Sequence, residues 1–254
     1  MQPLTSHTGH SSEPSTAPYN RYENPYPLLL TSLLLLSHLD LVAQDKSLQV
    51  GLKGGLNLAS LQLDDPTIPA GRAKPGLNLG ATVSYYLKAN LFLQSGLSLT
   101  SKGMKLESTS SLGLGDDFVR PGRQASLVSQ QWYAQIPLYL GYALPLGSTT
   151  KLILNAGPYV AYGLGGKTKL TGDIIYGDMI DYSTWEEPTF GPRGLGRLDV
   201  GIGAGVGIEL GRATIGLSYE AGLHDIRPTQ LAYIPFYATG YRNRLLSLLI
   251  QHRL

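Results

Sequence analysis

The chain contains no cysteine, which excludes disulfide bonds, thiolate metal sites, cysteine nucleophiles and a lipid anchor on an N-terminal cysteine. Charged residues make up only 15% of it, and a formal net charge of +2 is too small to indicate nucleic-acid binding. Beyond the N-terminal region, no apolar run approaches the roughly 20 residues that a transmembrane helix needs. Phenylalanine is scarce, at 4 residues, whereas glycine reaches 31 and tyrosine 16. This composition favours many strands and turns over helices.

The one long apolar run lies near the N-terminus, where residues 28–36 read LLLTSLLLL. Its length is that of the core of a signal peptide, and the polar His38 and Asp40 prevent a spanning helix. We therefore expect residues 1–44 to be an N-terminal extension and signal peptide that is removed on export. Residues 45–254 then form the mature domain. The alternative is a buried hydrophobic helix.

Apolar and polar residues alternate repeatedly in the mature chain, most clearly in residues 198–210. There every second residue is apolar, and the residues between them are glycine, aspartate or glutamate. A helix would scatter the two sets around its circumference, whereas a strand places each set on one face. Seven further segments alternate in the same way: residues 48–58, 77–87, 91–105, 131–142, 151–165, 214–224 and 241–254. The sequence thus predicts eight strands, an even number.

The connections between these strands alternate in length. The short ones are residues 88–90, 143–150 and 211–213, and the long ones are residues 61–76, 106–130, 166–197 and 225–240. Transmembrane barrels have short turns at one end and long loops at the other. The predicted fold class is therefore all-β: an eight-stranded antiparallel transmembrane β-barrel of the bacterial outer membrane, with short periplasmic turns and long extracellular loops. A soluble sandwich or a lipocalin-like barrel that binds a small ligand also has strands with alternating apolar and polar residues. Nothing in such a fold requires short connections at one end and long ones at the other.

The alternation directs charged side chains into the barrel. Eight strands leave an interior that side chains can fill, and charges buried there must be paired. Lys53 and Arg253 come from the two strands that meet to close the barrel, while Glu209 and Glu220 come from neighbouring strands across a short turn. We expect these four residues to form an ionic cluster that plugs the lumen, with Asp199 as a further inward charge.

The glycine-rich stretches fit strands better than nucleotide binding. Residues 161–168, AYGLGGKT, match a loosened phosphate-binding loop, but neither a helical pattern nor a parallel βαβ unit follows. In residues 198–210 the glycines stay two apart, so that they leave room for the inward Tyr133, Tyr139 and Tyr159. The two histidines of the mature chain lack metal-ligand spacing. We therefore expect no nucleotide, no metal and no other cofactor.

The long connection of residues 171–191 combines acidic and aromatic side chains. Clustered aromatics beside charges are typical of protein contact surfaces. The candidate contact residues are Tyr176, Tyr182, Trp185 and Phe190. The alternative is an acidic, solvated loop whose aromatics belong to the interfacial girdle of the barrel.

Four short stretches carry a resemblance to a known protein family: residues 54–57 (GGLN), 133–142 (YAQIPLYLGY), 156–160 (AGPYV) and 199–209 (DVGIGAGVGIE). Their order and spacing resemble the PorT-like outer-membrane β-barrel domain family of Bacteroidota, over residues 49–254. The chain departs from that family by ending on Leu254 rather than on an aromatic residue. The resemblance implies a barrel in the outer membrane without a single activity, and links some members to protein secretion and gliding machinery.

The expected function is that of a small, non-enzymatic outer-membrane barrel with a plugged lumen. It would anchor or scaffold envelope or secretion components through its extracellular loops, so its partners are outer-membrane lipid and an envelope protein, and not nucleic acid. The alternative is a barrel enzyme that acts on lipid or peptide at the rim, where His224 adjoins Asp225. A passive, porin-like channel is a third class, which eight strands disfavour.

Overall fold

Ten antiparallel strands make up most of the part of the chain that the computed structural model describes: residues 47–64, 72–108, 125–176, 179–191, 194–227 and 240–254. These residues all belong to the unit Val42–Leu254. The predicted signal segment, residues 1–44, lies outside the described residues. Within the described ranges, no helix has the length and apolarity that crossing a membrane requires. The strands are β1 (Leu48–Leu63), β2 (Lys74–Tyr86), β3 (Leu91–Ser108), β4 (Ala125–Pro145), β5 (Thr150–Gly165), β6 (Lys167–Tyr176), β7 (Met179–Pro188), β8 (Leu198–Leu210), β9 (Ala213–Gly222) and β10 (Tyr241–Arg253).

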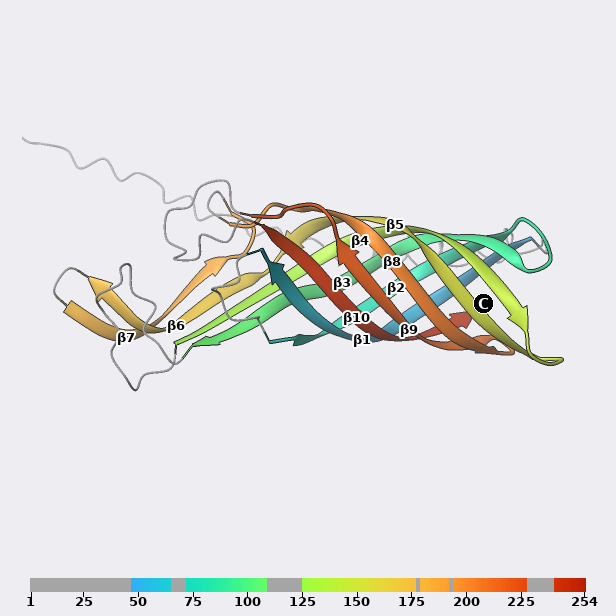
Figure 1. The fold of residues 1–254 in the computed structure, drawn as a ribbon, viewed down its shortest axis with the longest axis horizontal. Helices are drawn as coiled ribbons and strands as arrows, with labels where there is room; N and C mark the ends of the chain where they lie inside the picture. Colours follow the sequence, from blue (N-terminus) through green and yellow to red (C-terminus); the bar gives the residue numbers. More distant parts are fainter. Residues whose placement is uncertain (1–46, 65–71, 109–124, 177–178, 192–193, 228–239) are drawn as a thin grey trace, which may run out of the picture. The chain divides into compact units, whose positions relative to one another are not determined.

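Eight of these strands form a closed ring (Figure 1). Their order is β3-β2-β1-β10-β9-β8-β5-β4, and the pairing of β3 with β4 completes the circle. The first and last strands pair over a long antiparallel register, from Gly51 opposite Arg253 to Leu63 opposite Tyr241. A closed ring pairs the backbone of each of its strands on both sides, which is what hydrocarbon surroundings demand. The predicted eight-stranded barrel is confirmed.

The strand boundaries follow the alternation closely in the ring. β8 has the predicted bounds, whereas β4 begins at Ala125 rather than at residue 131. The prediction of a plain loop over residues 166–197 is wrong, because β6 and β7 form an antiparallel hairpin there. Ser126–Ser129 at the start of β4 pair with Thr168–Thr171 of β6. These extra residues of β4 find backbone partners beyond the ring, and Figure 1 shows the hairpin at the end opposite the C-terminus.

The outward face of the ring is apolar. On six successive strands, one side chain lies opposite the next in a continuous row: Leu77, Leu56, Leu248, Leu217, Val206 and Leu154. Each of them is 44–61% exposed, which would be costly in water but suits contact with lipid chains. Tyr85 and Tyr142 are exposed near the short turns, and Tyr162 near the opposite end, as in the two aromatic girdles of membrane barrels.

The inward face is polar and hydrogen-bonded. The Asn57 side-chain amide donates to the Thr100 hydroxyl at 2.9 Å and to the Leu77 carbonyl at 3.0 Å. The carbonyl oxygen of the same side chain accepts a hydrogen bond of 2.8 Å from the Ser247 hydroxyl. One asparagine thus links β1 to β2, β3 and β10 from inside. Polar groups within and leucines outside invert the usual arrangement of a water-soluble protein.

We predict that Leu248→Arg impairs assembly of the barrel far more than Leu146→Arg. Leu248 lies near the middle of β10 on the outward face, where an arginine costs about 2–4 kcal/mol in lipid. Leu146, equally exposed, lies in the short turn after β4, where the cost is about 0–1 kcal/mol. Heat-modifiable gel mobility of the membrane fraction measures the folded share. Equal yields of the two folded variants would contradict a lipid-facing β10.

Candidate functional site

Tyrosine rings fill the half of the lumen nearer the long loops. A Cβ atom added at Gly201 would lie 2.7 Å from the ring of Tyr159, and one added at Gly203 would collide with the hydroxyl of Tyr139. The missing side chains of β8 therefore make the space that these rings occupy. Tyr133 is completely buried beside them. The predicted inward placement of the three tyrosines is confirmed.

Lys102 of β3 is the cation at the centre of this layer. Its ammonium lies 2.9 Å from a carboxylate oxygen of Asp199 and 3.8 Å from one of Glu220, and its side chain is 1% exposed. It also lies 4.4 Å from the ring centroid of Tyr159, within the range of a cation–π contact. One cation thus faces two carboxylates and the face of an aromatic ring in a nearly dry site.

Neutral donors satisfy the carboxylate oxygens further. The Asn243 amide donates to Asp199 at 2.8 Å. Glu220 accepts hydrogen bonds from the Gln135 amide at 2.8 Å and from the Tyr139 hydroxyl at 3.2 Å. The layer therefore ties together side chains from β3, β4, β8, β9 and β10, so that its contacts cross the lumen as well as following the wall. We refer to Lys102, Asp199 and Glu220 with these donors as the buried ionic layer.

A second ionic group lies at the short-turn end. Glu209 of β8 is 3.2 Å from the Lys151 ammonium and 3.6 Å from the Arg253 guanidinium. Arg253 also donates to the Gln49 side chain at 3.3 Å and to the Gly211 carbonyl at 3.1 Å. The side chains of Lys151 and Arg253 are 36% and 29% exposed, whereas Glu209 is nearly as buried as Glu220.

The predicted cluster of Lys53, Glu209, Glu220 and Arg253 is divided between these two places. In the β8–β9 register Glu209 pairs with Thr214 and Glu220 with Gly203, so the two carboxylates are six residues apart along the strands. That separation is roughly 20 Å of extended backbone. Arg253 therefore pairs with Glu209, while Glu220 pairs with Lys102 instead of with either predicted cation.

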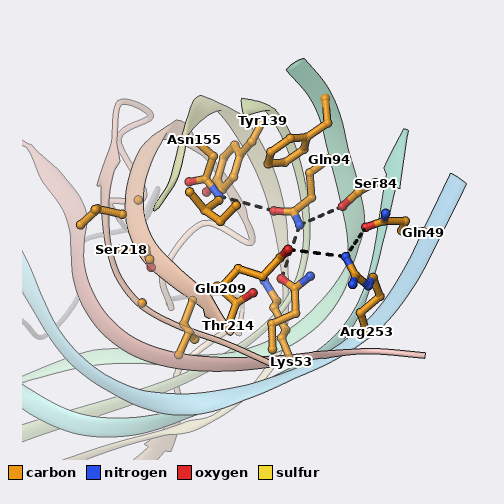
Figure 2. A pocket seen from close by; sticks show the side chains of 18 of the residues that line it. Gln49, Lys53, Ser84, Gln94, Tyr139, Asn155, Glu209, Thr214, Ser218 and Arg253 are labelled. Atoms are coloured by element: carbon orange, nitrogen blue, oxygen red, sulfur yellow. Dashed lines mark hydrogen bonds and ion pairs between the residues drawn. The ribbon is translucent and has the colours of Figure 1, made fainter. Parts of the chain in front are cut away.

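A cavity of about 100 Å³ lies between the two ionic groups, and all four predicted residues line it. Figure 2 shows the labelled side chains converging on it from many strands, with Lys53 and Glu209 among them. Gly205, Gly207 and Gly216 contribute backbone to its wall, and no aromatic ring is the first neighbour of a Cβ at these positions. Where the glycines of β8 are not covered by tyrosines, the lumen is open.

Lys102 is the residue that the sequence analysis missed. It lies two residues after the buried Thr100 and four after the buried Ser98, on the same face of β3, so the alternation indicated its inward direction. The predicted strand of residues 91–105 already contained Lys102, but the predicted cluster did not include it. Only the stagger of β3 against β8 brings it level with Asp199.

The structure describes the side chains of two of the four candidate contact residues, and these two differ in exposure. The side chains of Tyr176 and Tyr182 lie outside the described residues, although their backbones belong to the β6–β7 hairpin. Trp185 of β7 is 38% exposed. Phe190 was expected at the surface and is instead buried, with its ring centroid 5.3 Å from that of Tyr133. The chain after β7 turns back into the barrel mouth, because an aromatic ring gains more from packing there than from water.

The hairpin carries a surface ion pair. The Lys167 ammonium lies 2.6 Å from the Glu186 carboxylate. The hydrogen bond from Lys167 lowers the pKa of Glu186, and the same bond raises the pKa of Lys167. Both groups therefore stay charged over a wide range around neutral pH, and the hairpin presents fixed charges beside Trp185.

The remaining motifs show no catalytic or cofactor geometry in the described residues. Residues 161–168 lie at the end of β5 and the start of β6, without the helix that a phosphate-binding loop needs. No group of three His, Asp or Glu side chains in the described ranges is placed to hold a metal ion. His224 is exposed, and the neighbouring Asp225 carboxylate accepts backbone N–H bonds from Arg227 at 3.0 Å and Tyr241 at 2.9 Å.

We predict that Lys102→Met destabilises the barrel by about 3–5 kcal/mol, because it leaves Asp199 buried without its cation. Lys105→Met, in the same strand, removes only an exposed pair and should change stability little. Adding Asp199→Asn to Lys102→Met should recover part of the loss, since the unpaired charge is then gone. Urea unfolding of the barrel in lipid vesicles measures all four proteins. A Lys102→Met midpoint equal to that of the Lys105→Met variant would contradict this role.

No curated protein sequence matches the chain. Solved structures similar to it include Ail, the attachment invasion locus protein of Yersinia pestis, at 12% identity and a TM-score of 0.39 over 81% of this chain and 98% of that one. Neisserial surface protein A (NspA) is 10% identical, with a TM-score of 0.34 over 81% of this chain and 97% of that one. OprG from Pseudomonas aeruginosa is 10% identical, with a TM-score of 0.40 over 82% and 96%.

The family comparison is more direct. The model of the outer membrane protein beta-barrel domain matches residues 42–227, which is most of the chain. The match runs from just before β1 to just after β9, so it covers seven of the eight strands of the ring. Together with the closed ring and its apolar outer face, this match shows that the chain belongs to the outer membrane protein beta-barrel domain family and lies in the bacterial outer membrane.

Proposed function

We propose that this protein is a non-enzymatic barrel that anchors or scaffolds another component of the envelope, through the β6–β7 hairpin on its extracellular side. The observation that supports this most is the outer edge of β7. Among the strands that the structure describes, β7 pairs only with β6, so its other edge has no strand partner within the described residues. A strand edge of this kind is a ready template for an extended segment of a partner.

The side chains of the hairpin suit the same role. Trp185 is an exposed aromatic residue, and the charged Glu186 and Lys167 lie close to it in the sequence or across the hairpin. Aromatic residues within a charged rim are typical of protein interfaces. The backbones of Tyr176 and Tyr182 belong to the same hairpin, and the sequence prediction adds both residues to the proposed contact surface.

The PorT-like assignment, the class of partner and the signal segment are the parts of the proposal that rest on the sequence. The motifs of residues 133–142 and 199–209 support a PorT-like barrel, and with it a partner in the secretion or envelope machinery. Residues 1–44 would act as the signal segment for export, and residues 45–254 as the mature domain. Against an enzyme at the rim, the Asp225 carboxylate is occupied by its own loop, which leaves His224 without an orienting acid there.

We predict that a partner protein co-purifies with the tagged barrel from detergent-solubilised outer membrane and is lost when the hairpin is removed. The Thr189 N–H donates to the Gly166 carbonyl at 3.0 Å, so a two-residue Gly-Ser turn can replace residues 167–188 without moving the strands of the ring. The partner is identified by mass spectrometry at near-equal amounts with the wild-type barrel.

The control for this experiment is Trp185→Ala in the intact hairpin, which separates recognition by the side chain from recognition by the strand edge. Heat-modifiable mobility must show that both variants still assemble. Retention of the same partner after removal of the hairpin would overturn the assignment of the binding surface. The absence of any stoichiometric partner of the wild type would overturn the scaffold proposal itself.

We also predict that the purified barrel conducts no steady ion current in planar lipid bilayers. The buried ionic layer and the rings of Tyr133 and Tyr159 occupy the lumen near Lys102, and eight strands leave little space beside them. A Lys102→Ala, Tyr159→Ala double variant that still assembles should pass more current than the wild type. Stable single-channel steps from the wild type would support a channel instead.

A further inference from the structure

One cation in the lumen lacks a direct partner among the described residues. Lys53 of β1 lines the cavity and forms no ion pair or hydrogen bond there; Glu220 attracts it only from beyond ion-pair distance. The side chain is partly buried and adjoins the cavity. A charge in such a place needs either hydration or a counter-ion.

The carboxylates that line the same cavity are already paired with other cations. Glu209 lies 3.2 Å from Lys151 and 3.6 Å from Arg253. Glu220 lies 3.8 Å from Lys102 and belongs to the buried ionic layer. The lining of the cavity therefore carries three cations, Lys53, Arg212 and Arg253, against two carboxylates, Glu209 and Glu220, so positive charge is in excess there.

The neutral groups around this space leave donors pointing inward. The Gln94 amide nitrogen donates to Ser84 at 3.1 Å, as a dashed line in Figure 2 shows, and to the side-chain oxygen of Gln251 at 3.4 Å. The oxygen of Gln251 accepts in this bond and the residue lines the cavity, so its NH₂ group is the side-chain donor that this bond does not use. The hydroxyls of Thr214 and Ser218 line the cavity as well.

The cavity has the size and the access for a small solute. Its volume of about 100 Å³ is well above the roughly 10–15 Å³ that one water molecule requires, so it has room for several waters or for a small oxyanion. Arg212 and Arg253 lie on its lining beside the β8–β9 turn, and both are at least partly exposed. Positive groups at such an entrance raise the local concentration of anions.

We propose that the cavity binds a small oxyanion from the periplasm, a phosphate or a short carboxylate, with Lys53 as its counter-ion. The site is separate from the extracellular hairpin, so that it adds a second, periplasmic binding function to the barrel. An anion there would neutralise Lys53 and stabilise the closed barrel by mass action, because the unfolded chain offers no such site.

The test uses the full mature barrel, folded in a non-ionic maltoside detergent so that no lipid phosphate competes. Inorganic phosphate and, in a separate arm, acetate are titrated by calorimetry at constant ionic strength. We expect saturable binding of one anion per barrel and a higher urea midpoint in its presence. Lys53→Met should weaken binding roughly tenfold or more, since it removes a charge that the anion contacts directly.

The matched control is Lys88→Met, which removes an exposed lysine near the β2–β3 turn at the same end of the barrel. It should bind the anion as the wild type does. Lys53→Gln keeps a polar side chain and serves if the methionine variant does not assemble. Binding of only one of the two anions identifies the ligand as phosphate or as carboxylate. Saturation by neither anion, or unchanged binding by the folded Lys53 variants, overturns the proposal.

Discussion

The pairing of β1 with β10 is the contact on which the rest of this barrel depends. An open sheet in lipid would leave a row of N–H and C=O groups without partners, and each such group costs several kcal/mol. The register from Gly51–Arg253 to Leu63–Tyr241 removes that cost and also decides which side chains enter the lumen. Once the ring is closed, every second residue has to face either hydrocarbon or the interior. The apolar outer row and the polar lumen are both consequences of this closure.

Inside the ring, glycine and tyrosine divide the lumen into two regions. Where Gly201 and Gly203 face Tyr159 and Tyr139, ring and backbone pack closely and the polar groups between them are shielded from water. Hydrogen bonds and ion pairs are stronger in such a low-dielectric layer, which helps to explain how Lys102 is held by two carboxylates. Further along β8 the glycines are not covered by rings, and the charges there keep access to water. A single alternating strand thus produces a dry ionic layer and a wet cavity.

The sequence predicted the local features of this structure well and the distant contacts poorly. The alternation of apolar and polar residues predicted the bounds of β8 and the inward direction of Asp199, Glu209 and Glu220, because these features depend on the strand alone. The partners of these carboxylates depend on the stagger of strands across the lumen, which no local pattern encodes. The residues of the predicted cluster therefore lie in two groups, because Glu220 pairs with Lys102 and the β8–β9 register separates it from Glu209. Phe190 was misplaced for a similar reason, since its burial depends on where the chain after β7 meets the barrel mouth.

The same constraints restrict where this protein can act. The wall of the ring faces lipid, and the buried ionic layer occupies the lumen, so specific chemistry is confined to the two ends. At the extracellular end, β4 continues past the ring and pairs with β6, which places the edge of β7 beyond the barrel wall. At the periplasmic end, the cavity places Lys53 between paired carboxylates and inward-facing donors. Because the lumen between them is packed around Lys102 and its two carboxylates, the buried ionic layer separates the two ends.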